Sequence, residues 1–268
     1  MMNTSDFLLL VLLLAGCSAS ANTLFPTPSV PDITNGDGWT IGVGAGFEYE
    51  SEYDGSDDYG VEVEPSFIVQ KRQGRHMWFL EGQELGWRGR LNGLWLVQGG
   101  IRFEGGREES ESPLLAGLGD TDDEIMGMAE IRRAIGGNWS NWGAARLMAG
   151  DSDIGWLGVL AAGHTFGASE TGTGIDLYAF ATFASDEFIN RDFGITQEKS
   201  LSSGLSVTNL DGGYRSVGVQ ATGRWRFGKH WQLQAEAGYE KYNGDISDSP
   251  IVLDDYEAEV AVNLLYRF

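Results

Sequence analysis

The chain has 268 residues, one cysteine and a formal net charge of −21, from 18 Lys and Arg against 39 Asp and Glu. One cysteine excludes an intramolecular disulfide framework. The acidic balance argues against a nucleic-acid partner, because phosphates require a basic surface. Thirty-nine glycines with nine Trp, nine Tyr and 13 Phe favour a curved sheet closed by tight turns.

The N-terminus predicts an export signal over residues 1–21. The apolar run at residues 7–16 is too short to cross a bilayer, which takes about 20 residues in a helix. Ala19-Ser20-Ala21 has the small-x-small pattern that predicts cleavage after Ala21. Leu14-Ala15-Gly16-Cys17 also matches a bacterial lipobox, so lipidation of Cys17 is the alternative. Both processing routes lead to the outer membrane.

Residues 22–38 contain three of the six prolines and predict an extended periplasmic lead. From Trp39 onward the chain shows period-2 alternation, beginning with WTIGVGAGFEYE, which predicts strands with one apolar face. These strands exceed the five or six residues usual in soluble proteins, and aromatic side chains frame their ends. Both features are typical of transmembrane barrels. Residues 39–268 therefore predict an all-β fold, a closed antiparallel transmembrane β-barrel, in preference to a soluble sandwich or lipocalin-like fold.

The number of strands is less clear from the pattern. Eleven alternating segments stand out: 39–50, 59–70, 75–87, 92–104, 124–135, 139–150, 154–168, 173–184, 214–227, 230–242 and 255–268. Single-chain bacterial barrels have an even number of strands, so twelve is the prediction and ten the alternative. The missing strand lies within 75–104, where alternation is least regular, or within 196–207. The long acidic segments 51–58, 105–124, 185–213 and 243–254 predict surface loops.

Six fragments occur in an order that resembles one family. They are YDGSDDYGVEVEP from Tyr53, GREESESPLLAGLGD from Gly106, FGIT, SGL, SDSPIV and the terminal YRF. Together they resemble the MltA-interacting protein family, also called MipA/OmpV, although the Cys17 lipobox departs from its usual signal. The resemblance implies an outer-membrane barrel that acts as a scaffold between a lytic transglycosylase and a bifunctional penicillin-binding protein. Other members are associated with osmotic adaptation, adhesion or antibiotic response.

The last strand carries a separate signal. Leu264, Tyr266 and the terminal Phe268 alternate along one face. This ending resembles the signal that the barrel-assembly machinery reads. We therefore expect this machinery, outer-membrane lipid and lipopolysaccharide among the partners.

The sequence does not favour an enzyme. The three histidines, His76, His164 and His230, lack the neighbouring nucleophile and orienting group of a Ser-His-Asp site. The acidic residues 120–124, Asp151 and Asp153 have oxygens of the kind that Ca²⁺ prefers. They are more simply solvated loop charges, bridged to lipopolysaccharide by divalent cations. We predict no catalytic residue, cofactor or specific metal site.

The polar strand faces predict a charged lumen. Its expected members are Glu48, Glu62, Glu64, Arg132, Arg224, Arg226, Glu236, Glu257, Glu259 and Arg267. Paired charges would form a plug, whereas unpaired charges would line a selective pore. The plug is favoured because wide aqueous channels belong to barrels of about 16 strands or more. The scaffold is the preferred function; a small solute channel and a surface adhesin or stress-response barrel are the alternatives.

Overall fold

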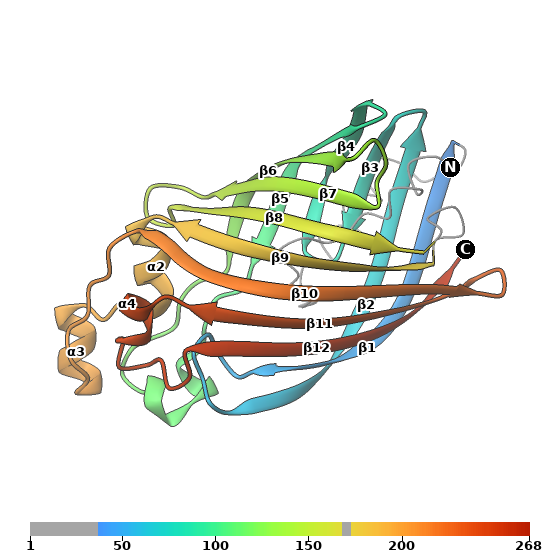
Figure 1. Ribbon diagram of the computed structural model, residues 1–268. Helices are drawn as coiled ribbons and strands as arrows, with labels where there is room; N and C mark the ends of the chain where they lie inside the picture. The colour runs from blue at the N-terminus through green and yellow to red at the C-terminus, as the bar shows by residue number, and fades with distance from the viewer. Residues whose placement is uncertain (1–36, 168–172) are drawn as a thin grey trace.

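The computed structural model describes residues 37–167 and 173–268 (Figure 1). Twelve antiparallel strands form a closed barrel, in which each strand pairs with its neighbours in the chain and β1 pairs with β12. The strands are β1 (Gly38–Ser51), β2 (Tyr59–Gln73), β3 (His76–Glu81), β4 (Glu84–Asn92), β5 (Trp95–Glu104), β6 (Glu124–Ile135), β7 (Asn141–Ala149), β8 (Trp156–Phe166), β9 (Gly174–Ala184), β10 (Gly213–Phe227), β11 (Trp231–Tyr242) and β12 (Tyr256–Arg267). The predicted barrel of twelve strands is confirmed. The predicted cleavage site at Ala21 and the lipobox Cys17 lie outside the described residues.

Alternation of side chains gives the barrel an apolar outside. On β6, Ile125, Ile131 and Ile135 are 55%, 41% and 52% exposed, whereas Met126 and Arg132 between them are almost fully buried. Successive side chains of a strand point to opposite faces, so the isoleucines cover the outer surface. This surface is the apolar face that lipid requires.

The prediction of one strand over residues 75–87 is wrong. This segment contains β3 and the start of β4, joined by a two-residue turn at Gly82 and Gln83. Gly82 has φ +53°, a conformation that glycine adopts readily in a primed hairpin turn. The short β3 spans six residues, so the hairpin resembles one irregular strand in the sequence. Residues 196–207 contain no hidden strand; they contain helix α3 (Gln197–Ser203).

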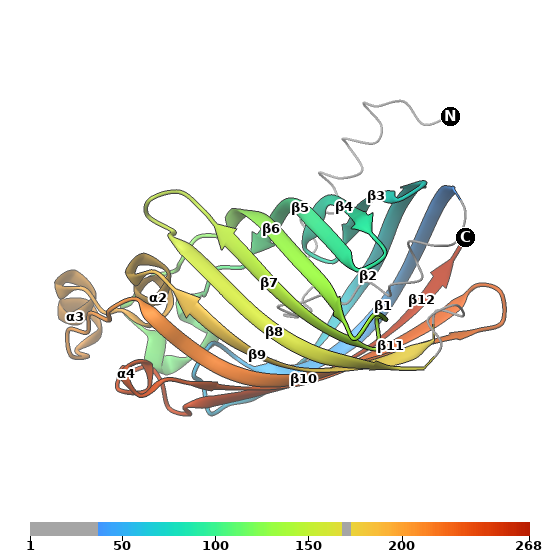
Figure 2. The same ribbon diagram turned by 45° about the horizontal axis from the view of Figure 1, so that its top comes forward.

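The two ends of the barrel differ in their connections. Five of the connections and both termini of the described barrel lie at one end, the short-turn end (Figure 1). The short β3–β4 and β7–β8 connections lie at the other end. The segments 52–58, 105–123, 185–212 and 243–255 also lie at that other end, together with α2 (Asp186–Phe193), α3 and α4 (Gly244–Ser247) (Figure 2). Outer-membrane barrels have short periplasmic turns and long extracellular loops, so the long segments face the exterior.

The long segments pack together into a cap. Tyr53, Leu115, Leu118, Ile195 and Ile251 come from all four segments and form a buried apolar cluster. The Tyr53 hydroxyl donates to the Ile251 carbonyl at 3.1 Å, which joins the first segment to the last. The predicted surface loops therefore have a core of their own. Within the cap, short 3₁₀ turns occur at η2 (Glu109–Glu111) and η3 (Pro113–Leu115).

The helices of the cap are short. Ser185 and Thr196 cap the first turns of α2 and α3 by accepting from Phe188 N and Lys199 N. Within residues 37–167 and 173–268, no helix has the length and apolar character needed to cross a membrane.

Candidate functional site

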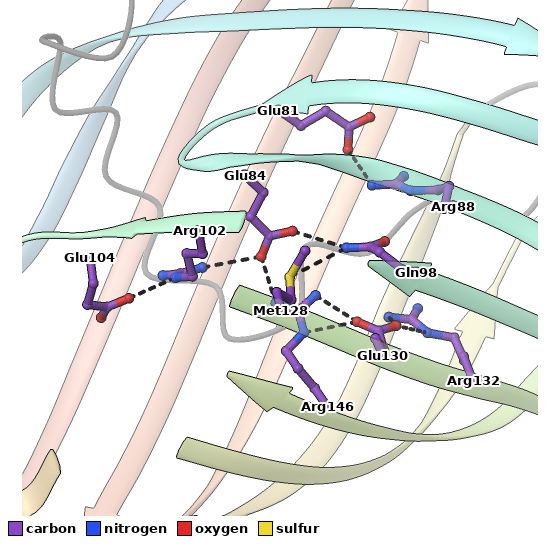
Figure 3. A network of polar contacts seen from close by, with 10 residues as sticks. All are labelled: Glu81, Glu84, Arg88, Gln98, Arg102, Glu104, Met128, Glu130, Arg132 and Arg146. Atoms are coloured by element: carbon purple, nitrogen blue, oxygen red, sulfur yellow. Dashed lines mark hydrogen bonds and ion pairs between the residues drawn. The ribbon is translucent and has the colours of Figure 1, made fainter. Parts of the chain in front are cut away.

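The inner face of β4, β6 and β7 holds an ion-pair network (Figure 3). Arg146 on β7 is its centre. Its Nη1 donates to Glu84 Oε1 at 2.7 Å, and its Nε and Nη2 donate to Glu130 Oε2 at 3.0 and 2.6 Å. Arg132 Nε donates to the other oxygen of Glu130 at 3.1 Å. Each of these four side chains is almost fully buried, so the pairs form in a region of low dielectric where a lone charge is costly.

The network continues toward both edges of this wall. Arg102 on β5 lies 3.5 Å from Glu84, and its Nε donates to Glu104 Oε2 at 2.9 Å. A separate ion pair lies on the β3–β4 hairpin, where Arg88 donates to Glu81 Oε2 at 2.9 Å. Five strands, β3 to β7, thus contribute charges to this wall of the lumen.

Aromatic side chains fill the space beside the charges. The guanidinium of Arg88 lies 4.0 Å from the Phe79 ring centre, and that of Arg132 lies 4.6 Å from the Trp142 ring. Such cation–π contacts stabilise a charge where water is excluded. Arg88, Arg132 and Trp142 are among the largest fully buried side chains of the described residues. This part of the lumen is therefore filled with side chains.

The opposite wall is acidic. Glu48 on β1 lies within electrostatic range of Glu50, Glu64, Glu236 and Glu259. Hydrogen bonds to neutral side chains reduce the repulsion: Gln220 Nε2 donates to Glu236 at 3.4 Å and to Glu259 at 3.2 Å. A carboxylate-rich wall thus faces a wall on which arginines and glutamates are paired.

The structure distributes the predicted lumen residues over different depths. Glu48, Glu64 and Glu236 are buried in the acidic wall, and Arg132 belongs to the ion-pair network. Glu62 is exposed and pairs directly with Glu48 across β1 and β2. The other members lie nearer the two ends: Glu257 and Glu259 toward the cap, and Arg224, Arg226 and Arg267 toward the short turns. Arg226 and Arg267 both donate to Gln232, at 3.4 and 3.0 Å, whereas Arg224 lies within electrostatic range of Glu236.

Most residues of the ion-pair network were not predicted from the sequence. Its unpredicted members are Glu81, Glu84, Arg88, Arg102, Glu104, Glu130 and Arg146. Three of them lie on the β3–β4 hairpin, and reading this hairpin as one strand assigns its side chains to the wrong faces. The EGQE sequence around Gly82 is the signal that indicates the turn.

A cavity of about 270 Å³ lies between the lumen and the cap, and we call it the vestibule. Its charged lining comprises Arg107, Arg191 and Arg215 together with Glu50, Glu52, Asp54, Glu104, Glu111, Asp192, Glu240, Glu257 and Glu259. Burial raises the pKa of Asp192 to about 6, against the opposing effect of the neighbouring Arg191.

The histidines lie near the short turns. His164 Nδ1 is 2.7 Å from Asn141 Oδ1, His230 Nδ1 is 2.8 Å from the Arg267 carbonyl oxygen, and His76 stacks on Trp87. Among residues 37–167 and 173–268, no three His, Cys, Asp or Glu side chains are grouped so as to hold a metal ion.

The C-terminal residues lie at the seam between β12 and β1. Leu264 and Phe268 are exposed on the outer surface, and the Tyr266 ring contacts those of Trp231 and Phe268. The Phe268 N–H donates to the Ile41 carbonyl at 2.8 Å. Their recognition by the assembly machinery stays a prediction.

The closed barrel with a lipid-facing surface defines the protein as an outer-membrane β-barrel. A family model described as "MltA-interacting protein MipA" matches residues 43–268. The chain belongs to this family, as the sequence resemblance indicated.

Curated relatives agree with the outer-membrane location. The chain is 25% identical over 166 residues to "Putative outer membrane protein YiaT" of Escherichia coli O157:H7, covering 58% of this chain and 66% of the relative. It is 24% identical over 159 residues to the protein of the same name from strain K12, covering 56% and 63%. In both cases the match spans less than two thirds of the relative.

The chain is also similar to solved structures of other barrels, at low sequence identity. The KdgM porin aligns with 85% of this chain and 99% of its own at 10% identity, with a TM-score of 0.41. An outer membrane channel from Pseudomonas putida F1 aligns with 91% and 100% at 13% identity, with a TM-score of 0.45.

Proposed function

We propose that this protein is a non-enzymatic scaffold that holds cell-wall-remodelling proteins at the short-turn end of its barrel. The family description supports this proposal because it names an interaction with MltA. The resemblance in the sequence identifies the expected partners as a murein lytic transglycosylase and a penicillin-binding protein. These partners act in the periplasm, which the short-turn end faces.

Charge at the short-turn end is the observation that carries the proposal. Arg75, Arg133 and Lys229 are exposed there, whereas the carboxylates of the described residues at this end are Asp37 and Asp176. The remaining chain is strongly acidic, so the charge at this end is opposite in sign to the net charge of the protein. Complementary charge steers partners and fixes their orientation, and this end therefore suits an anionic partner.

The filled lumen favours a scaffold over a channel. Arg88, Arg132 and Trp142 are fully buried on the inner wall, whereas side chains that line an aqueous pore are exposed to water. Wide aqueous channels belong to barrels of about 16 strands or more, and this barrel has twelve.

The test is a cross-linked pull-down of the barrel from its native envelope, read by mass spectrometry. We expect enrichment of a lytic transglycosylase or a penicillin-binding protein. Replacement of Arg75 and Lys229 with glutamine is expected to lower this enrichment about tenfold, because two charge pairs are lost. Lys241→Gln, which removes an exposed charge near the cap, is the matched control and should preserve it. Recovery of only assembly proteins and lipopolysaccharide would contradict the scaffold.

A surface-binding role at the cap is the second candidate. Fragments that carry the family resemblance meet there: Tyr53 bonds to Ile251, and Ser249 Oγ donates to the Phe193 carbonyl at 2.7 Å. Lipopolysaccharide without cell-wall enzymes in the pull-down would favour this role.

A further inference from the structure

The α2 side of the vestibule presents two partly satisfied guanidinium groups. Arg107 Nη1 donates to the Asp192 carbonyl at 2.6 Å, and Arg191 Nη2 donates to the Gly105 carbonyl at 2.9 Å. Arg191 Nε also lies 3.7 Å from the Asp192 carboxylate, whereas Arg107 Nε and Nη2 and Arg191 Nη1 are buried without a hydrogen-bond acceptor among the described residues. Unsatisfied buried donors are costly, so their presence beside a cavity points to an anionic ligand.

A β-bulge brings a third guanidinium to the vestibule. The pairing of β9 with β10 shifts register between Tyr214 and Ser216, which leaves Arg215 as the extra residue. Its side chain is 7% exposed, donates to Glu240 at 2.7 Å and to Asp54 at 3.0 Å, and keeps Nε without an acceptor among the described residues. The bulge thus directs a charged side chain inward at the level of the cavity.

Carboxylates dominate the rest of the lining. The vestibule has nine carboxylates and three guanidiniums, so its formal charge is strongly negative. Arg215 is paired with Glu240 and Asp54, whereas the Glu257 carboxylate accepts from two neutral donors, Ser51 Oγ at 3.3 Å and Gly55 N at 3.0 Å. Glu259 accepts from Gln220. Glu50, Glu257 and Glu259 therefore suit a ligand that brings positive charge.

We propose that the vestibule binds a small amino-acid-like solute that carries one carboxylate and two amines. Its carboxylate contacts Arg107 and Arg191, and its amines contact the carboxylate wall around Glu257 and Glu259. Charge-assisted hydrogen bonds of this kind are stronger than neutral ones and give orientation. A cavity of about 270 Å³ is smaller than most drug-binding pockets, which fits a ligand of the size of lysine.

The position of the vestibule identifies the side from which the ligand arrives. The cavity lies below the cap, which faces the exterior, and the ion-pair network fills the lumen beneath it. The ligand therefore enters from the external medium. This site is independent of the scaffold proposal, because it uses the opposite end of the barrel.

The first experiment compares three probes on the detergent-purified barrel by isothermal titration calorimetry. L-Lysine has both amines and the carboxylate, cadaverine lacks only the carboxylate, and 6-aminohexanoate lacks only the α-amine. We expect lysine to bind about tenfold more tightly than either analogue, because each analogue loses one charged contact. Equal binding of lysine and cadaverine, or absence of lysine binding, would overturn the proposal.

The second experiment assigns the carboxylate contact to the two arginines. In the variant Arg107→Gln/Arg191→Gln, we expect the preference for lysine over cadaverine to disappear while cadaverine binding is retained. Lys241→Gln removes a charge from the outer surface at the same end and should leave the preference unchanged. An unchanged preference in the double variant would contradict the assignment. The comparison of probes on the unmodified protein stands even if the double variant fails to fold.

Discussion

Replacement of Arg146 with methionine is expected to lower the free energy of unfolding by about 3 kcal/mol. Methionine preserves most of the side-chain volume but removes the charge that joins Glu84 to Glu130. Both carboxylates stay buried with one arginine partner fewer, and this uncompensated charge is the main source of the loss. The measurement is urea unfolding in detergent micelles, followed by tryptophan fluorescence.

Two controls separate this effect from a general loss of packing. Adding Glu84→Gln to Arg146→Met leaves Arg102 paired with Glu104 and Arg132 paired with Glu130, so the excess buried charge is removed and most of the stability should return. Lys241→Met breaks the exposed pair with Asp255 and should leave the midpoint unchanged, because exposed pairs contribute little. If Arg146→Met and Lys241→Met had the same midpoint, the network would have no role in stability.

Replacement of Gly44 with alanine is expected to weaken the seam that closes the barrel. A Cβ atom at Gly44 would lie 2.0 Å from the Leu264 carbonyl oxygen and 2.8 Å from the Leu265 Cα. Both are backbone atoms of β12, so β1 and β12 must move apart to admit one methyl group. Overpacking of this kind costs about 1–3 kcal/mol or more. Loss of the compact band in unheated gel electrophoresis measures the effect.

Gly60 on β2 provides the matched control. It also lies in a strand, but a Cβ atom there would meet nothing within 4 Å. Gly60→Ala should therefore give the compact band of the unmodified protein. A normal band for Gly44→Ala would show that the seam tolerates separation.

The sequence predicts the barrel well because lipid imposes a simple rule on it. Outward side chains within the lipid must be apolar, so Ile125 and Ile131 alternate with inward residues and period-2 patterning identifies the strands. The same rule predicted that Glu48 and Arg132 belong on the polar faces. It fails at the β3–β4 hairpin, where a two-residue turn at Gly82 interrupts the alternation too briefly to stand out.

The pairing of charges and the cap follow from long-range contacts that local patterns do not encode. Arg146 meets Glu84 only because four strands, β4 to β7, curve around the lumen, and these residues are 62 positions apart. Arg107 and Arg191 approach each other because the cap folds onto itself. Acidic composition alone predicted solvated loops, since the few buried residues of the cap, such as Leu115 and Ile251, are dispersed among charges.

Single-channel recording of the purified protein in a planar lipid bilayer tests the closed lumen most directly. A barrel filled by the ion-pair network and its aromatic neighbours should insert without discrete conductance steps at moderate voltage and salt. Reproducible steps of one size from the unmodified protein would contradict this account, and they would identify the charged lumen as a pore.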